Sequence, residues 1–140
     1  GVSWDARIMP VRALGIDGGT SYDLQQAIRY AAGLPNVSGR LPAVTADIIN
    51  LSVGSSFSSA TEQQTLNEVR TRGILVVASA GNDGSATPVY PAGYQGVLAV
   101  SASTVGDTLA SYSNFGPHID LAAPGGDAER TCGPSDCVFS

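Results

Sequence analysis

Residues 76–84 read VVASAGNDG, an apolar run that ends in two small residues and then presents an asparagine. The run begins at residue 74, and the length of ILVVAS is typical of a buried strand rather than of a helix. The Asn-Asp-Gly sequence that follows is typical of a turn. The stretch therefore predicts a strand that leaves the core through Ala80 and Gly81 and carries the carboxamide of Asn82 at its end.

The strand at 74–79 is one of several that the sequence predicts, and helical patterns alternate with them. The runs at 46–52, 74–79 and 97–102 are too continuously apolar for strands that expose one face. One helix starts at Thr20 or Ser21 and ends at Gly33, and a second spans residues 59–72. This alternation predicts an α/β fold, with a doubly wound parallel sheet and helices on both faces. The remaining predicted strands are residues 8–14 and 119–122.

Both predicted helices carry start and stop signals. Thr20 with Asp23, and Ser59 with Glu62, have the spacing of a capping box, in which side-chain oxygens accept hydrogen bonds from free backbone N–H groups. A glycine follows each helix. In the first helix, apolar residues recur at the i, i+3, i+4, i+7 spacing of one face, at Leu24, Ala27, Ile28 and Ala31.

Length and charge limit the classes of function. A chain of 140 residues with 43% hydrophobic content predicts a single domain, residues 1–140, with a core of its own. The net charge is −5, and the seven basic residues are scattered arginines, which argues against nucleic acid as a partner. No apolar run approaches the roughly 18–20 residues that would span a bilayer, so no membrane is expected either.

The two cysteines, Cys132 and Cys137, bracket Gly-Pro-Ser-Asp. A turn of that composition can bring their Cα atoms to bridging distance, which favours a small loop disulfide. A pair of reduced thiols is the alternative, and the compartment decides between them. A metal site would need more Cys or His ligands than the neighbouring sequence supplies, so none is predicted.

Three loops follow buried strands and combine small residues with polar ones. Their sequences are Ser-Val-Gly-Ser from residue 52, Ala-Gly-Asn-Asp-Gly from residue 80 and Ala-Pro-Gly-Gly from residue 123. In parallel sheets, ligands bind where loops diverge beyond the carboxyl ends of the strands. Small residues let a substrate backbone come close, and an amide on a rigid strand end can donate a hydrogen bond to a developing oxyanion. The carboxamide of Asn82 suits that role.

Five segments together resemble the central part of subtilisin-like serine proteases, the subtilases or peptidase S8 family. In chain order they read ARIMPVRALG, ADIINLSVGS, VVASAGNDG, YPAGYQGVLAVSAS and LASYSNFGPHIDLAAPGG. The resemblance implies an incomplete subtilisin-like fold and a part of a secreted, extracellular serine endopeptidase. It also implies an extended peptide or protein substrate, no required cofactor, and structural calcium only as a possibility in the complete enzyme.

The resemblance assigns roles to individual residues. Asn82 corresponds to the oxyanion-hole asparagine. Gly18 and Gly19 belong to an edge that pairs with substrate, and Val89 falls on the floor of the main specificity pocket, where it favours small or medium apolar side chains. A core valine is the alternative at position 89. The remaining pocket residues are Ser52, Val53, Gly54, Ala80 and Gly81. The resemblance also predicts a cis peptide bond between Tyr90 and Pro91.

The motifs of the catalytic triad do not occur in this sequence at the places where the family carries them. The family has its aspartate in Asp-Ser/Thr-Gly and its histidine in His-Gly-Thr-His, and neither stretch is present. Its nucleophile lies in a Gly-Thr-Ser stretch C-terminal to the matched segments, whereas the one Gly-Thr-Ser of this sequence is at residues 19–21, ahead of most of them. The single histidine, His118, lies outside any such motif and is expected to be a solvent-facing turn residue. The isolated chain is therefore predicted to be inactive, and self-association of the fragment is expected.

Two other classes of function remain as alternatives. A nucleotide-binding domain is suggested by the glycines at positions 15, 18 and 19, but their spacing differs from Gly-x-Gly-x-x-Gly and no acidic residue ends the next strand. A degenerate protease that serves only for binding, or a purely structural fragment, is the non-enzymatic alternative.

Overall fold

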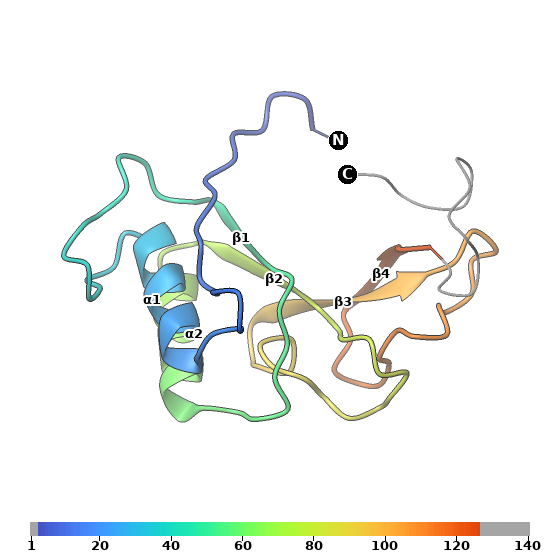
Figure 1. Ribbon diagram of the computed structural model, residues 1–140. Coiled ribbons are helices and arrows are strands. Elements are labelled where there is room, and N and C mark those ends of the chain that lie inside the picture. Colours follow the sequence, from blue (N-terminus) through green and yellow to red (C-terminus); the bar gives the residue numbers. More distant parts are fainter. Residues whose placement is uncertain (1–2, 127–140) are drawn as a thin grey trace. The chain divides into compact units, whose positions relative to one another are not determined.

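The computed structural model describes residues 3–126, which form two helices and four strands (Figure 1). The helices are α1 (Ser21–Ala31) and α2 (Ala60–Thr71). The strands are β1 (Ile48–Leu51), β2 (Leu75–Ser79), β3 (Val97–Ser103) and β4 (Leu121–Pro124). The element order confirms the α/β class. No described helix has the length and apolar character needed to cross a membrane.

The four strands form one parallel sheet in the order β1-β2-β3-β4. Between β3 and β4 the parallel register pairs Val100 with Leu121 and Ser103 with Pro124. The order of the strands in the sheet is thus the same as their order in the sequence. A doubly wound sheet also contains a point at which the strand order reverses, and the described strands do not include such a point.

The chain divides into two compact units, one of residues 1–49 and 59–76 and the other of residues 50–58 and 77–140. In the first unit α1 and α2 contact each other, and Arg29 of α1 forms an ion pair with Glu68 of α2 at 2.9 Å. The core of this unit consists of aliphatic side chains, namely Ile28, Ala31, Ala32, Leu34, Ile49, Leu66, Val69, Ile74 and Val76.

The second unit has a core built mainly from small residues. Its buried apolar residues are Leu51, Ala78, Ala80, Ala92, Tyr94, Val97, Ala99 and Ala110. Because the alanine side chain is small, the backbone segments that pack around these alanines can lie close to one another. The Tyr90–Pro91 peptide bond of this unit is cis, which confirms the prediction made from the resemblance.

The helix starts differ from each other. At α1 the predicted capping box is complete: the Thr20 hydroxyl accepts from the Asp23 N–H at 3.1 Å, and the Asp23 carboxylate accepts from the Thr20 N–H at 3.0 Å. At α2 the prediction is wrong, because the Ser59 side chain makes no capping hydrogen bond. The carboxylate of Glu62 instead accepts a hydrogen bond from the Ser21 hydroxyl at 2.7 Å.

Two expectations about the strands are wrong. Residues 8–14 form no strand, and Ile8 is 88% exposed, because an apolar segment becomes a strand only when a neighbouring strand pairs with its backbone. β1 and β2 alternate between buried and exposed residues, and Ile48 and Leu75 are 60% and 44% exposed. An apolar run is buried on both faces only where a further layer covers the sheet, and no described residue covers these side chains.

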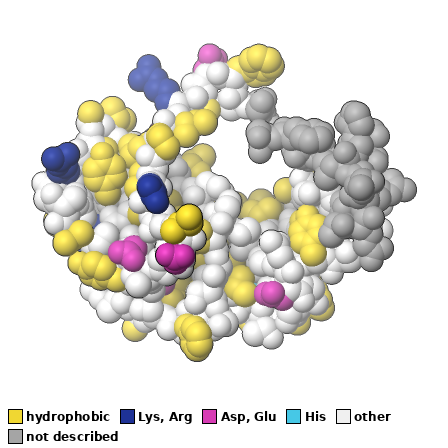
Figure 2. All heavy atoms as spheres, in the orientation of Figure 1, with side chains coloured by type: hydrophobic (Ala, Val, Ile, Leu, Met, Phe, Trp, Pro, Cys, Tyr) yellow, Lys and Arg dark blue, Asp and Glu magenta, His cyan; other side chains and the backbone are white. Residues whose placement is uncertain are grey.

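Other apolar side chains are also exposed, as the space-filling view shows on one face (Figure 2). Trp4 is 94% exposed, Ile16 is 97% exposed and Phe57 is 82% exposed. Cys132 and Cys137, and with them the predicted disulfide, lie outside the described residues.

Candidate functional site

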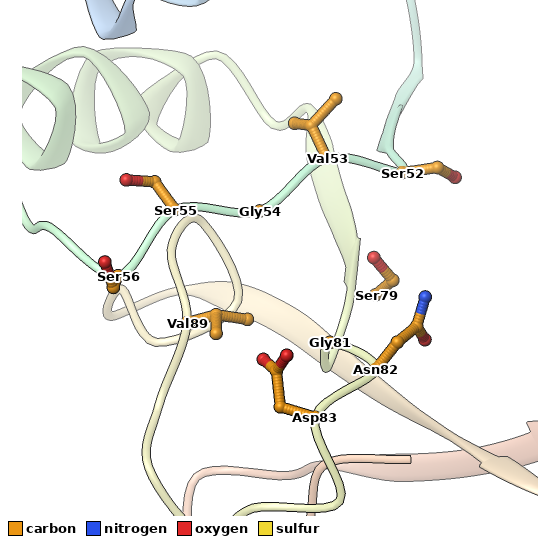
Figure 3. A pocket seen from close by; sticks show the side chains of 10 residues that line it. All are labelled: Ser52, Val53, Gly54, Ser55, Ser56, Ser79, Gly81, Asn82, Asp83 and Val89. Atoms are coloured by element: carbon orange, nitrogen blue, oxygen red, sulfur yellow. The ribbon is translucent and has the colours of Figure 1, made fainter. Parts of the chain in front are cut away.

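A cavity of about 420 Å³ opens in the second unit, where three loops meet (Figure 3). The loops are residues 52–56 after β1, residues 79–83 at the end of β2, and the loop that carries Val89. The lining residues are Ser52, Val53, Gly54, Ser55, Ser56, Ser79, Gly81, Asn82, Asp83 and Val89. Six of them carry a hydroxyl, carboxamide or carboxylate, so the walls offer hydrogen-bonding groups around a small apolar surface.

One wall of the cavity is held in place by backbone pairing. Ser55 and Tyr90 exchange two backbone hydrogen bonds, each 2.8 Å long. This antiparallel bridge fixes residues 52–56 beside Val89. A Cβ atom on Gly54 would lie 3.8 Å from Cγ2 of Val89, which is ordinary van der Waals contact. Val89 therefore lies close to Gly54, and both residues line the cavity.

The opposite wall is the end of β2. Ala80 is buried, and its N–H donates to the Val100 carbonyl at 2.9 Å, which anchors the strand end to β3. Gly81 follows with a φ of +106°, a region that L residues with a Cβ rarely adopt. A Cβ atom on Gly81 would lie 2.9 Å from Cγ2 of Val89. Glycine is thus required both by the backbone conformation and by the narrow space.

Asn82 and Asp83 stand at the rim of the cavity, and both are exposed. In Figure 3 the carboxamide of Asn82 lies on the side of Ser79, and the carboxylate of Asp83 points toward Val89. The structure records no hydrogen bond from the Asn82 carboxamide to any described residue. Its N–H donors are therefore free for a ligand.

The cavity brings together most of the residues that the sequence predicts for the site. Ser52, Val53, Gly54, Gly81, Asn82 and Val89 all line it. Ala80 is buried and does not line it. Gly18 and Gly19 belong to the other unit, where Gly15 and Gly18 form a local antiparallel bridge. Their pairing with substrate stays a prediction.

Two lining residues, Ser56 and Ser79, lie outside the loops that the sequence indicated, and two more, Ser55 and Asp83, lie in those loops but had no predicted role. Each is a direct chain neighbour of a predicted residue or lies one position beyond it, so a wider window around each strand end would have included them. A further residue, Asn114, contacts the loop that bears Asn82 through two backbone N–H groups. No signal in the local sequence of Asn114 indicates this contact.

Other candidate groups lie outside the cavity. His118 lies in a turn, as predicted, but it is half-buried and not solvent-facing. It does not line the cavity, and its Nε2 atom is buried without a hydrogen-bond partner among the described residues. The described residues contain no group of three or more His, Cys, Asp or Glu side chains that could hold a metal ion.

The whole sequence resembles known proteases. Residues 1–137 match the sequence profile described as the Subtilase family. The chain is 42% identical over 132 residues to the thermophilic serine proteinase of Bacillus sp. strain AK1, covering 94% of this chain and 30% of that protein. It is 44% identical over 129 residues to the extracellular protease of Xanthomonas campestris pv. campestris, covering 89% of this chain and 22% of that protein.

A solved structure has the same fold. The structure of a protease from Pseudoalteromonas arctica PAMC 21717 superimposes with a TM-score of 0.88 at 38% sequence identity. The match covers 93% of this chain and 39% of that one. The chain thus spans less than half the length of the relatives that it matches.

Proposed function

Since this chain belongs to the subtilase (peptidase S8) family, we propose that it is the central part of the catalytic domain of a secreted serine endopeptidase. The observation that carries the proposal is the cavity at the end of β2, where the Asn82 carboxamide makes no hydrogen bond to a described residue and Val89 is among the lining residues. Similarity to relatives that are named extracellular proteases supports secretion.

In the proposed reaction a serine outside this chain attacks the carbonyl carbon of the substrate peptide bond. A histidine accepts the serine proton and then donates it to the leaving amine, while an aspartate orients the imidazole. The carbonyl oxygen becomes an oxyanion in the tetrahedral intermediate, and the Asn82 carboxamide donates a hydrogen bond to it. Such a donor stabilises the transition state more than the ground state, because the oxygen acquires its charge only as the bond forms.

The walls of the cavity are suited to an extended peptide. The loop of Ser52, Val53 and Gly54 has little bulk, so a substrate backbone can approach it as an additional strand. Gly18 and Gly19 are proposed to supply the pairing on the other side of the substrate. The side chain at the cleaved position is then proposed to enter the cavity, which Val89 lines together with the loops of residues 52–56 and 79–83.

The role of Asn82 is tested in the complete enzyme that contains this chain. We expect Asn82→Ala to lower kcat by about 10²–10³, the loss associated with one oxyanion donor, with little change in KM. The magnitude is that of the corresponding donor in subtilisin, the standard example, and is carried over from that relative. Asn67→Ala, at an exposed asparagine of α2, is the control. If KM carries the whole effect, Asn82 binds substrate and does not stabilise the oxyanion.

The role of Val89 is tested by enlarging the pocket. We expect Val89→Gly to raise kcat/KM for peptides with a large apolar side chain at the cleaved position, relative to peptides with a small one. A peptide series that differs only at this position measures the change. An unchanged preference would make Val89 a core residue without a part in specificity.

A further inference from the structure

Among the residues that the structure describes, Asn114 is the most buried polar one, and it lies next to the loop that bears Asn82. It is 0% exposed and belongs to the segment that follows β3. Its Oδ1 accepts from the N–H of Asp83 at 2.9 Å and from the N–H of Ser85 at 3.2 Å. Its own backbone N–H donates to the carbonyl of Gly81 at 3.0 Å.

These hydrogen bonds determine the orientation of the Asn114 carboxamide. Both partners of the side chain are N–H donors, so the atom that faces them must be the oxygen. The Nδ2 atom is consequently turned the other way, where it is buried without a partner. A buried donor without a partner raises the free energy of the folded state. The two hydrogen bonds that Oδ1 accepts must therefore stabilise this orientation by more than the unpaired Nδ2 destabilises it.

Asn114 and Gly81 also fit together sterically. A Cβ atom on Gly81 would lie 2.5 Å from Nδ2 of Asn114, which is closer than real side-chain carbons approach. Only a glycine at position 81 leaves room for the carboxamide. The buried amide and the glycine therefore form one packing unit behind the cavity wall.

Asn114 forms hydrogen bonds to residues on both sides of Asn82 in the sequence. Gly81 precedes it, and Asp83 and Ser85 follow it, so Asn114 holds the backbone at all three positions. The Asn82 side chain itself has no recorded hydrogen bond to described residues, so the direction of its carboxamide depends on the backbone that carries it. A hydrogen-bond donor contributes to catalysis only when it is held in place before the charge develops.

We propose that Asn114 is the positioning residue of the oxyanion donor: its carboxamide fixes the backbone of residues 81–85 and thereby the place of the Asn82 amide. The inference rests on the proposed function, because it assigns a consequence to the orientation of Asn82. Asn114 does not line the cavity and is not itself a catalytic residue.

The first test is a set of substitutions in the complete enzyme. We expect Asn114→Ala to lower kcat about tenfold to a hundredfold with little change in KM, since small misplacements of catalytic groups have effects of this size. Asn114→Asp keeps an oxygen acceptor for both N–H groups, so it should retain more of the kcat than Asn114→Ala, even though the carboxyl oxygen that replaces Nδ2 is buried without a partner and lowers the stability. If the alanine variant does not fold, Asn114→Ser, whose shorter side chain cannot reach both N–H groups, replaces it.

Ser113→Ala is the matched control, because Ser113 is the buried neighbour of Asn114 but does not reach the Asn82 loop. It is 2% exposed, and its Oγ accepts from the Ala102 N–H at 2.8 Å and donates to the backbone carbonyl of Asn114 at 3.1 Å. Ser113→Ala therefore removes a contact to the Asn114 backbone and leaves the Asn114 carboxamide with both of its hydrogen bonds. This variant should lose stability without the loss in kcat that Asn114→Ala shows. A purely structural role for Asn114 would make the two variants alike.

Two further measurements separate positioning from stability. If Asn114 acts through Asn82, the losses in kcat must not multiply, and Asn114→Ala should have little further effect in an Asn82→Ala background. In the inhibited enzyme, the amide protons of Asp83 and Ser85 should exchange with solvent faster in Asn114→Ala and as slowly as in the wild type in Ser113→Ala.

Fully multiplicative losses, or an Asn114→Ala effect on kcat no larger than that of Ser113→Ala, would overturn the positioning role while leaving the proposed function intact. If Asn82→Ala itself leaves kcat unchanged, both the proposed function and the catalytic part of this inference fall. Amide exchange then still reports whether Asn114 holds the loop.

Discussion

Both the backbone conformation of Gly81 and two neighbouring side chains require a glycine at this position. It has a φ of +106°, and a Cβ there would meet Asn114 at 2.5 Å and Val89 at 2.9 Å. We expect Gly81→Ala to destabilise the complete enzyme by about 1–3 kcal/mol through backbone strain, with an added steric penalty. Thermal unfolding of the inhibitor-blocked enzyme measures this. Gly54→Ala, whose Cβ would meet only Val89 at 3.8 Å, should have a much smaller effect; equal losses would contradict the steric argument.

At the scale of single residues, the local pattern identified Asn82 but not Asn114. Small residues followed by an amide at a strand end are visible in a window of nine residues. The contacts of Asn114 join it to Asp83 and Ser85, which lie 31 and 29 positions earlier in the chain. A partner so distant in sequence has no local signature, because only the packing of the loop after β3 brings the two segments together.

At the scale of elements, the start of α1 is the clearest confirmed prediction. We expect Thr20→Ala to destabilise the first unit by about 1 kcal/mol, because it removes the hydroxyl that accepts from the N–H of Asp23. Ser59→Ala is the matched control at α2, since that hydroxyl makes no capping hydrogen bond, and it should cost less. Denaturant unfolding of both variants measures the difference, and equal losses would show that the capping box contributes nothing.

The same capping box predicts a pH dependence. Hydrogen bonds from the Thr20 hydroxyl and then from the Thr20 backbone N–H hold the pKa of Asp23 below its ordinary value of about 4. A lowered folded-state pKa adds stability that is present above the unfolded value and is lost as the pH falls through the folded value. The stability difference between the wild type and Thr20→Ala should therefore shrink in acid. A difference that grows on acidification would contradict the role of the ionised carboxylate.

At the scale of the whole molecule, the isolated chain of 140 residues should be inert. It contains no His-Gly-Thr-His motif, and its one Gly-Thr-Ser, at residues 19–21, lies N-terminal to the Asn82 strand, whereas the family carries its nucleophile C-terminal to that strand. We expect no peptide hydrolysis and no reaction with a serine-directed phosphonate probe. Mass spectrometry of the treated chain is the measurement, and a stoichiometric adduct on any serine would contradict the assignment of the nucleophile to another part of the enzyme.

The isolated chain should also self-associate. The exposed face of β1 and β2 carries apolar residues, including Ile48 at 60% and Leu75 at 44% exposure, and large exposed apolar surfaces bind partners. We expect a second copy to cover this face and not the Asn82 loop. Sedimentation at micromolar concentration tests the association, and Ile48→Lys should weaken it while Val105→Lys, at an apolar residue in the loop after β3, should not. A monomer at all concentrations would contradict the prediction.

The sequence by itself determined the α/β class, both helices, the strands at β1 to β4 and the carboxamide at the end of β2. These features depend on periodicity, capping and turn chemistry, and all three are visible in residues that are close to one another in the sequence. Tertiary structure alone decided that residues 8–14 form no strand, that β1 and β2 expose one face, and that Asn114 holds the loop of Asn82. Each of these depends on which distant backbone or side chain comes within hydrogen-bonding or van der Waals distance, and no local pattern carries that information.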